Sequence, residues 1–375
     1  MVANSVMPIY QEKQLQEISR QFQIYGEVLH AEPCKIGHIN ETYTATYAQG
    51  GVLVRYIHQK INTTVFRDPV GVMHNLMRVT GHIRRQLETA GARDITRRVL
   101  TVVPTRHGDP FYRNADGECW RTFVFVERVR TFEAVETPEQ AHQAGRAFGE
   151  FQLQLVDLPG ERLVETIPDF HNTRKRFTAL QAAIAEDRLN RAQQARKEIA
   201  FALGQEKIVD VIVHGLAKKK IPERITHNDT KFNNVMLDAQ SGAAMCVVDL
   251  DTVMPGSALY DFGDMVRTTT SPTLEDELDL AKVQMGMPMF KALARGYLES
   301  AGSFLTKGER SLIAFSGKLI TFTIGIRFLT DYLSGDTYFR VHRAQHNLDR
   351  ARTQFKLVQS IEQQEKVMQK FADSI

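Results

Sequence analysis

The sequence has few cysteines and no close pair of them. Cys34, Cys119 and Cys246 are its three cysteines, and they lie far apart in a chain of 375 residues. Structural zinc sites and disulfide frameworks need closely spaced cysteines. We therefore expect three reduced core residues in a cytoplasmic protein.

An excess of one charge and long apolar runs are also missing. The 47 basic and 44 acidic residues leave a net charge of +3, too small a bias to predict nucleic acid or a membrane as a partner. No basic stretch followed by an apolar core begins the chain, so no signal peptide is expected. The most apolar segment, 317–333, contains Arg327 and Asp331 and falls short of a membrane span, which predicts a buried helix.

Hydrophobic periodicity divides the chain into two parts, as its length also suggests. Strands are expected in 27–48, 51–61, 97–106 and 120–129, with helices over 9–25 and from Asp68-Pro69 to Gly91. From Thr137 onward the pattern is mostly helical, interrupted by short strands and loops at 225–251. We predict an α+β protein with a small, mostly antiparallel lobe over 1–129 and a larger, mainly helical lobe over 130–375.

The segment ITHNDTKFNNVMLD, residues 225–238, has the spacing H-x-D-x-K-x-x-N before an apolar triplet. The run CVVDLD then adds Asp249 and Asp251. A hairpin between Asp229 and Asp249 would bring both carboxylates and Asn234 to one end. Three carboxylates gathered there would destabilise the site unless a metal compensates them.

Phosphoryl transfer from ATP needs a base, a cation and oxygen ligands for Mg²⁺. Asp229 is the candidate base, Lys231 the cation, and Asn234 and Asp249 the ligands. His227 is expected to brace the loop through hydrogen bonds, because imidazole is a poor Mg²⁺ ligand. The alternative is an ordinary polar loop, since Asn and Asp are common in turns.

The chain resembles the aminoglycoside phosphotransferase and choline kinase superfamily, and more narrowly the N-acetylhexosamine 1-kinase group. The resemblance rests on GHINETY (37–43), YIHQKINTTVFRDP (56–69), IPDFHNT (167–173), HNDTKFNNV (227–235), VVDLDTVMPGSALYDFGDMVR (247–267), FLTDYLSGDTYF (328–339) and HNLDRARTQFKLVQSIE (346–362). It implies a two-lobed protein-kinase-like fold with ATP between the lobes, Asp229 as base, and Asn234 and Asp249 as magnesium ligands. It also implies the acceptor, the anomeric hydroxyl of N-acetylglucosamine or N-acetylgalactosamine, which becomes a sugar 1-phosphate.

Residues of the first lobe are predicted to bind the nucleotide. Gly37 would let a turn approach the phosphates closely. Lys60, with Arg55 as the competing candidate, would meet the α and β phosphates. Backbone around Phe125 to Glu127 would pair with adenine.

One position departs from the family pattern. The helix after the third strand usually supplies a glutamate to the strand cation, but His74 stands there, and Glu88 comes later on the same helix. This departure supports a different function, that of a nucleotide-binding protein without turnover. The remaining candidate functions are a kinase of another sugar, an aminoglycoside or an amino alcohol, and a metallohydrolase built on His227, Asp229 and Asp249.

The predicted sugar contacts are polar residues from three segments. In the family the first-lobe turn faces the sugar, which implies His38 and Asn40. The second-lobe candidates are Asp169, His171, Asn172, Arg174, Arg327, Asp331 and Tyr338. Arg327 and Asp331 share one helix face, so a buried salt bridge is the alternative for that pair. The resemblance implies that an arginine and a tyrosine at these positions bind the sugar.

The DFG triplet in YDFGDMVR looks like the metal motif of protein kinases. It lies too far beyond Asp229, so the metal aspartate is assigned to Asp249. Asp261 and Asp264 are expected to hold the neighbouring loops by hydrogen bonds.

Overall fold

The structure is a computed structural model that describes residues 12–34 and 39–375. The chain forms two compact units. Unit 1 comprises Met1–Val129, Gly160–Ile167 and Met245–Val253, and unit 2 comprises Arg130–Pro159, Pro168–Ala244 and Met254–Ile375. Two segments that the sequence analysis placed in the second lobe, 160–167 and 245–253, thus belong to unit 1.

Unit 1 is built on a six-stranded antiparallel sheet. Its strands are β1 (Glu27–Pro33), β2 (Glu41–Gln49), β3 (Val52–Ile61), β4 (Val102–Val103), β5 (Tyr112–Arg113) and β6 (Cys119–Val124). They are ordered β1-β2-β3-β6-β4, and β5 pairs with β6. The prediction for 97–106 was mostly wrong, since Ile95–Arg98 forms a short helix, α3. Pro104 then ends β4, because it has no N–H for the ladder.

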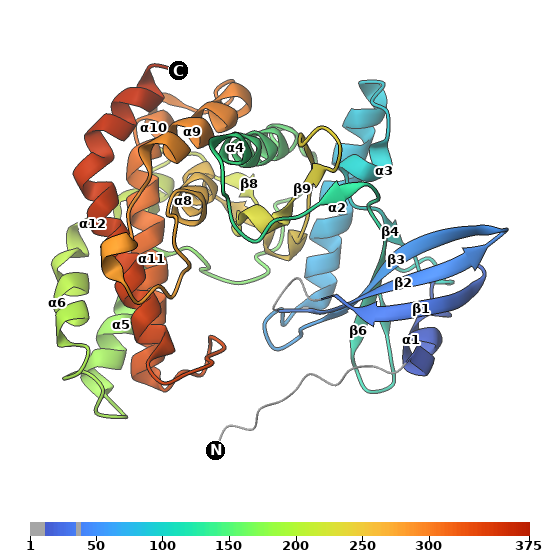
Figure 1. The fold of residues 1–375 in the computed structure, drawn as a ribbon, viewed down its shortest axis with the longest axis horizontal. Helices are drawn as coiled ribbons and strands as arrows, with labels where there is room; N and C mark the ends of the chain where they lie inside the picture. Colours follow the sequence, from blue (N-terminus) through green and yellow to red (C-terminus); the bar gives the residue numbers. More distant parts are fainter. Residues whose placement is uncertain (1–11, 35–38) are drawn as a thin grey trace. The chain divides into compact units, whose positions relative to one another are not determined.

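One hydrophobic cluster of unit 1 lies on one face of this sheet. Successive side chains of a strand alternate between faces, so Tyr43, Ala45 and Tyr47 of β2 are buried together, beside Trp120 of β6. Helix α1 (Glu12–Ser19) packs against this cluster (Figure 1).

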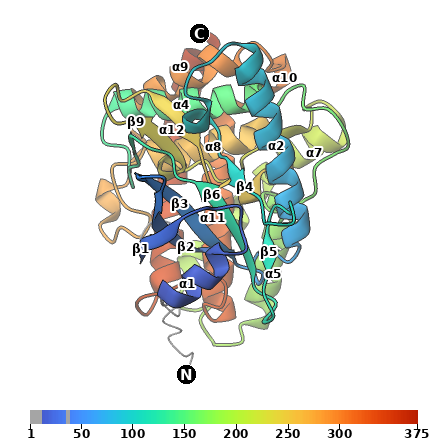
Figure 2. The same cartoon turned by 90° about the vertical axis from the view of Figure 1, so that its right-hand side faces the viewer.

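Helix α2 (Pro69–Thr89) begins as the sequence predicts. Asp68 caps it by accepting a hydrogen bond from the Gly71 N–H, and Pro69 occupies the first turn, where its missing N–H costs nothing. The helix runs beside β4 and β6 (Figure 2).

Unit 2 is mainly helical. Its helices are α4 (Pro138–Leu153), α5 (Thr173–Glu186), α6 (Arg196–Gly204), α7 (Val211–Ala217), α8 (Ala258–Thr269), α9 (Met287–Ala301), α10 (Lys307–Arg310), α11 (Ile313–Ser334) and α12 (His346–Asp373). Strands β8 (Arg224–Thr226) and β11 (Met254–Gly256) pair with each other. Three short strands remain: β9 (Val235–Asp238) lies in unit 2, β7 is Val129–Arg130, and most of β10 (Ala244–Val247) belongs to unit 1.

The helices of unit 2 pack in close pairs: α4 lies on α9, and α11 lies on α8 and α12 (Figure 1). Glycines allow this approach, since a Cβ on Gly145 of α4 would stand 2.2 Å from the Leu293 carbonyl oxygen of α9. Helix α11 is long and apolar enough to cross a membrane, but 83% of its most apolar window is buried within the protein. The predicted buried helix is confirmed.

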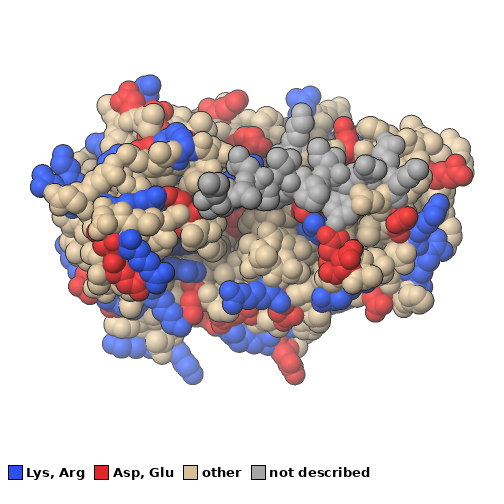
Figure 3. Space-filling view, turned by 90° about the horizontal axis from the view of Figure 1, so that it is seen from below, with Lys and Arg blue, Asp and Glu red and all other residues tan. Residues whose placement is uncertain are grey.

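The surface carries charges of both signs. On the face shown in Figure 3, basic and acidic side chains of the described residues are interspersed. This agrees with the small net charge of +3.

Candidate active site

The HNDTKFNN segment forms a loop in unit 2 between β8 and β9, closed by the 3₁₀ turn η2 (Phe232–Asn234). The Asp229 carboxylate, with 19% of its side chain exposed, lies 3.1 Å from the Lys231 Nζ. Asn234 donates from Nδ2 to the backbone oxygen of Asp229 at 2.8 Å. The structure therefore brings together three of the predicted site residues.

Two carboxylates of α8 hold this loop from beneath. Asp261 accepts hydrogen bonds from the backbone N–H groups of His227 at 2.9 Å and Asn228 at 2.7 Å. Asp264 accepts from the backbone N–H of Thr230 at 2.9 Å. These bonds fix the peptides on both sides of Asp229 and offset the left-handed backbone of Asn228, whose φ is 66°. The predicted loop-holding role of Asp261 and Asp264 is confirmed.

The glycine of the DFG triplet has a packing role. A Cβ on Gly263 would stand 2.4 Å from the backbone oxygen of Ser316 in α11. Gly263 thus lets α8 lie directly on α11, which places Asp261 and Asp264 under the loop.

His227 braces the loop, as predicted. Its side chain is fully buried and makes edge contacts with the rings of Phe148 and Phe151. Its Nδ1 accepts a hydrogen bond from the Asp229 backbone N–H at 3.3 Å.

The charges around Asp229 keep it ionised. Burial raises the pKa of Asp229, but the charge of Lys231, the electrostatic effect of His227, the hydrogen bond from Lys231 and the charge of Arg267 bring it below its ordinary value. Such a carboxylate is a weak base at neutral pH, so it serves best by orienting a hydroxyl group. Burial raises the pKa of the neighbouring Asp261 to about 6.

Arg267 extends this network beyond the loop, and sequence reasoning missed it. Its Nε donates to Asp264 Oδ1 at 2.9 Å, and its Nη1 donates to Glu275 Oε1 at 2.7 Å. Its position three residues after Asp264 in a helix was an available signal, because residues i and i+3 are neighbours.

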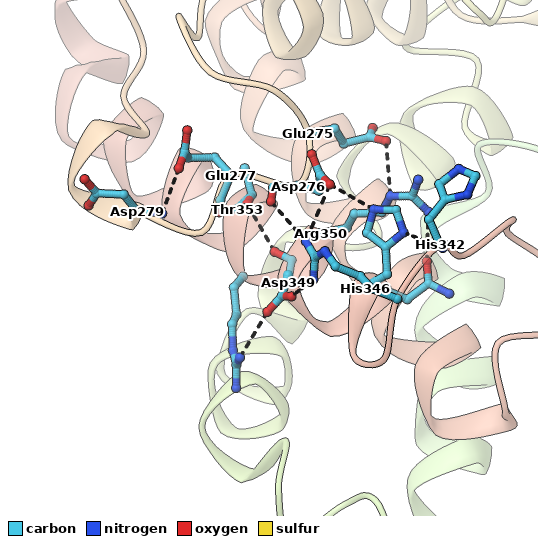
Figure 4. Close-up of polar contacts among 12 residues, drawn as sticks. Glu275, Asp276, Glu277, Asp279, His342, His346, Asp349, Arg350 and Thr353 are labelled. Atoms are coloured by element: carbon cyan, nitrogen blue, oxygen red, sulfur yellow. Dashed lines mark hydrogen bonds and ion pairs between the residues drawn. The ribbon is translucent and has the colours of Figure 1, made fainter.

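Glu275 belongs to an acidic segment that is tied to the start of α12. Asp276 Oδ2 lies 2.9 Å from His346 Nε2, and Glu275 lies 4.0 Å from Arg350, as Figure 4 shows. The network thus connects the loop around Asp229 with α12.

The predicted metal ligands lie in different units. In unit 2, the Asn234 Oδ1 has no hydrogen-bond partner within the described part of the chain, because Nδ2 makes the contacts with Asp229. In unit 1, Asp249 is exposed and has a left-handed backbone with φ 58°. An amide oxygen and a carboxylate are hard donors that suit Mg²⁺. Over residues 12–34 and 39–375, no group of three His, Cys, Asp or Glu side chains gathers as a metal site. A site made of one asparagine and one aspartate is not tested by this finding.

The prediction that Asp251 needs a metal to compensate its charge was wrong. Its carboxylate is 1% exposed and pairs with Arg121 at 2.5 Å, and Asn40 donates to it from Nδ2 at 2.7 Å. Its charge is therefore compensated by an arginine and does not call for a metal. Asn40 Oδ1 accepts from the Asn62 N–H at 2.9 Å, so both polar groups of this predicted sugar contact already have protein partners.

Lys60 has one glutamate partner on β2 and another just before β6. Its Nζ lies 2.5 Å from Glu41 and 3.2 Å from Glu118, whereas His74 and Glu88 of α2 are exposed. Burial lowers the pKa of Lys60, but the two glutamates raise it above its ordinary value. Lys60 thus pairs with these two glutamates and not with a glutamate of α2.

The predicted adenine-binding segment is held by two arginines. Arg55 forms an ion pair with the Glu127 side chain, and its backbone oxygen accepts from the Phe125 N–H at 3.1 Å. Arg97 Nε donates to the Glu127 carbonyl at 3.0 Å. The pairing of this backbone with adenine stays a prediction.

The four candidates near α5 have protein partners. Asn172 caps α5 by accepting from the Lys175 N–H, and Asp169 pairs with the Lys175 side chain at 2.7 Å. Arg174 pairs with Asp210 at 2.5 Å. His171 is buried, and its Nε2 lies 2.8 Å from the Asn228 carbonyl oxygen. We expect His171 to affect a substrate through the loop of Asp229.

The candidates on and after α11 do not form the alternative salt bridge. Asp331 accepts hydrogen bonds from the backbone N–H groups of Thr337, Tyr338 and Phe339 at 2.8–2.9 Å and so shapes the loop that follows α11. Arg327 Nη2 donates to the Tyr338 hydroxyl at 3.3 Å. Two further candidates, Gly37 and His38, lie outside the described residues.

Residues 30–297 match the phosphotransferase enzyme family, APH. The chain belongs to this family. It is similar to the microcompartment-associated aminopropanol kinase at 14% identity, with a TM-score of 0.58 over 96% of this chain and 98% of that one. An aminoglycoside phosphotransferase from Alicyclobacillus acidocaldarius subsp. acidocaldarius DSM 446 matches at 12% identity and a TM-score of 0.60, over 98% and 99%. A spectinomycin phosphotransferase solved with ADP and spectinomycin matches at 13% and 0.52, over 95% and 99%.

At these identities the solved structures show the fold. The antiparallel sheet of unit 1 and the helical unit 2 agree with them, so the predicted α+β, two-lobed, protein-kinase-like fold class is confirmed. The chain is a phosphotransferase of this fold.

Proposed function

We propose that the protein is an ATP-dependent kinase of N-acetylhexosamines that phosphorylates the anomeric hydroxyl of N-acetylglucosamine or N-acetylgalactosamine. The arrangement around Asp229 carries the phosphotransfer part of the proposal: an ionised carboxylate, a lysine at 3.1 Å and an asparagine with an unused amide oxygen. The family match supports the reaction class, and the sequence blocks of the N-acetylhexosamine 1-kinase group support the sugar.

In this proposal Asp229 orients the sugar hydroxyl and accepts its proton as the phosphoryl group arrives. Lys231 contributes positive charge beside that carboxylate. Asn234 and Asp249 would hold Mg²⁺, which when bound neutralises charge on the phosphates. Lys60 and the backbone at 125–127 would bind ATP, and the enzyme would work in the cytoplasm.

A second group of acceptors, amino alcohols and aminoglycosides, is suggested by the names of the similar structures. Arg176 and Arg327 of unit 2 disfavour it. Neither makes an ion pair with a carboxylate in the described part of the chain, so an ammonium group nearby would be repelled by two positive charges.

The test is a panel of acceptors with labelled ATP, assayed for the sugar 1-phosphate. N-acetylglucosamine and N-acetylgalactosamine should be phosphorylated, and aminopropanol and spectinomycin should not. The D229N variant should lose turnover and still bind ATP. If neither N-acetylhexosamine is phosphorylated, the sugar assignment is wrong; if D229N retains activity, so is the role of Asp229.

A further inference from the structure

Two arginines lie side by side across the contact between α5 and α11. The hydroxyls of Thr173 and Thr323 join these helices at 2.8 Å in the interior. Arg176 follows Thr173 by one turn and therefore lies on the same face of α5. Arg327 likewise follows Thr323 by one turn and lies on the same face of α11. Phe170 touches both, since Arg176 Nη2 donates to its carbonyl at 3.2 Å and the Arg327 guanidinium lies 5.0 Å from its ring centre.

Neither arginine has an ion-pair partner. No carboxylate lies within ion-pair distance of Arg176 or Arg327 anywhere in residues 12–34 and 39–375. The neighbouring cations are paired: Arg174 with Asp210, and Lys175 with Asp169. Arg176 and Arg327 thus differ from the neighbouring cations of α5, which have carboxylate partners.

The surroundings of the two arginines make their positive charges unfavourable in free energy. Both side chains are half-buried, and Arg327 lies 5.6 Å from the ring centre of Tyr338 and 5.4 Å from that of Phe339. Burial lowers the pKa of Arg176, and the charge of Arg327 lowers it further. Like charges in such a setting destabilise each other unless an anion compensates them.

The pair adjoins the loop that carries Asp229. Phe170 is followed by His171, whose Nε2 contacts the carbonyl oxygen of Asn228 at 2.8 Å. Asn228 directly precedes Asp229, and the charge of Asp229 also acts on the pKa of Arg327. The arginines therefore adjoin the loop where, under the proposed function, the acceptor binds.

We propose that Arg176 and Arg327 form a subsite for an anionic group, a carboxylate or a phosphate ester, on the acceptor. The inference rests on the proposed function and narrows it: among N-acetylhexosamines, the enzyme prefers those that carry an acidic substituent. A guanidinium group binds carboxylates and phosphates through two parallel hydrogen bonds. A neutral sugar offers the two guanidinium groups no such partner.

The test measures binding by titration calorimetry with the full chain and no nucleotide. The ligands are N-acetylglucosamine, its 6-phosphate and its 3-O-carboxyethyl ether. At least one acidic ligand should bind about tenfold tighter than the neutral sugar, as a charged hydrogen bond provides, and comparison of the two identifies the group. R176Q and R327Q should each remove most of this preference, and R176K, which keeps the charge but not the two parallel donors, should retain only part of it.

R188Q is the control, because Arg188 is an exposed cation just after α5 that pairs with Glu186 at 2.8 Å. It should leave the preference unchanged. Equal affinities for the three ligands, no binding of any, or a preference that survives both R176Q and R327Q would overturn the subsite. Turnover is assayed separately, and a lack of phosphorylation of all three would refute the proposed kinase activity whatever the binding result.

Discussion

Asn234 donates a hydrogen bond from Nδ2 to the backbone oxygen of Asp229 at 2.8 Å. With the amide nitrogen engaged in this way, Oδ1 is the atom left for a metal ion. One side chain therefore links the position of the proposed base to the proposed magnesium site.

Removal of this side chain should weaken both functions. N234A loses the proposed metal ligand and the bond to Asp229, so we expect kcat to fall by about 10- to 100-fold and the Mg²⁺ concentration for half-maximal activity to rise. A Mg²⁺ titration of the kinase rate measures both effects. N233A, in the same 3₁₀ turn, should change the Mg²⁺ requirement much less; an unchanged requirement in N234A would remove Asn234 from the metal site.

Gly263 should tolerate no side chain. In G263A the new Cβ would meet the Ser316 oxygen at 2.4 Å, so α8 must shift, at a cost of about 1–3 kcal/mol in the free energy of unfolding. Activity should fall as well, because α8 carries Asp261 and Asp264. Thermal unfolding and kinase assays measure the two effects.

The matched control is G204A at the end of α6, where a Cβ meets no atom within 4 Å. This change should leave stability unaltered or raise it slightly. Equal stability of the two variants would contradict the close packing of α8 on α11.

The stability of the protein should decrease in mild acid. Burial lowers the pKa of His58 to about 4 and that of His171 to about 4. The unfolded chain binds these protons near pH 6.5, so stability is complete above that pH and is lost as the pH falls toward 4, by about 3 kcal/mol for each histidine. Asp261 acts in the opposite direction, because its pKa is raised to about 6.

Urea unfolding between pH 7 and pH 4.5 measures this loss. H58Q should flatten the profile, since glutamine keeps a polar group between the Tyr47 and Thr122 hydroxyls but does not titrate. A profile as steep as that of the wild type would show that His58 does not contribute.

Local patterns explain what the sequence predicts well. The alternation in β2 and the Asp68-Pro69 start of α2 depend on residues close together in the chain, and both are found in the structure. The spacing in HNDTKFNN is local too. It places Asp229, Lys231 and Asn234 within one loop.

Long-range charge pairing could not be predicted in this way. Asp251 pairs with Arg121, 130 residues away in sequence, and periodicity does not show which buried charges meet. One signal was available, because a position buried within the sheet rarely holds an arginine without a carboxylate partner. Asp331 could not be foreseen at all, since its partners are backbone N–H groups of a loop.

Arg267 should act as a positioning residue for Asp229. It binds Asp264 and Glu275, and Asp264 holds the Thr230 N–H next to Asp229. In R267M we expect kcat to fall by about tenfold or more, with a smaller change in KM for the acceptor. The positive charge of Arg267 also lowers the pKa of Asp229, so its loss should move the acid limb of the kcat–pH profile to higher pH.

R267K separates the two effects, because lysine keeps the charge but cannot bring two nitrogen atoms to Asp264 Oδ1 as Arg267 does. It should lower kcat and leave the acid limb in place. R146M is the control for loss of a charge, since Arg146 pairs with Glu150 on the exposed face of α4 and should alter neither quantity. An electrostatic effect of Arg267 on Asp229 must move the acid limb of the kcat–pH profile. If kcat falls in R267M while the acid limb stays in place, Arg267 acts only by positioning Asp264.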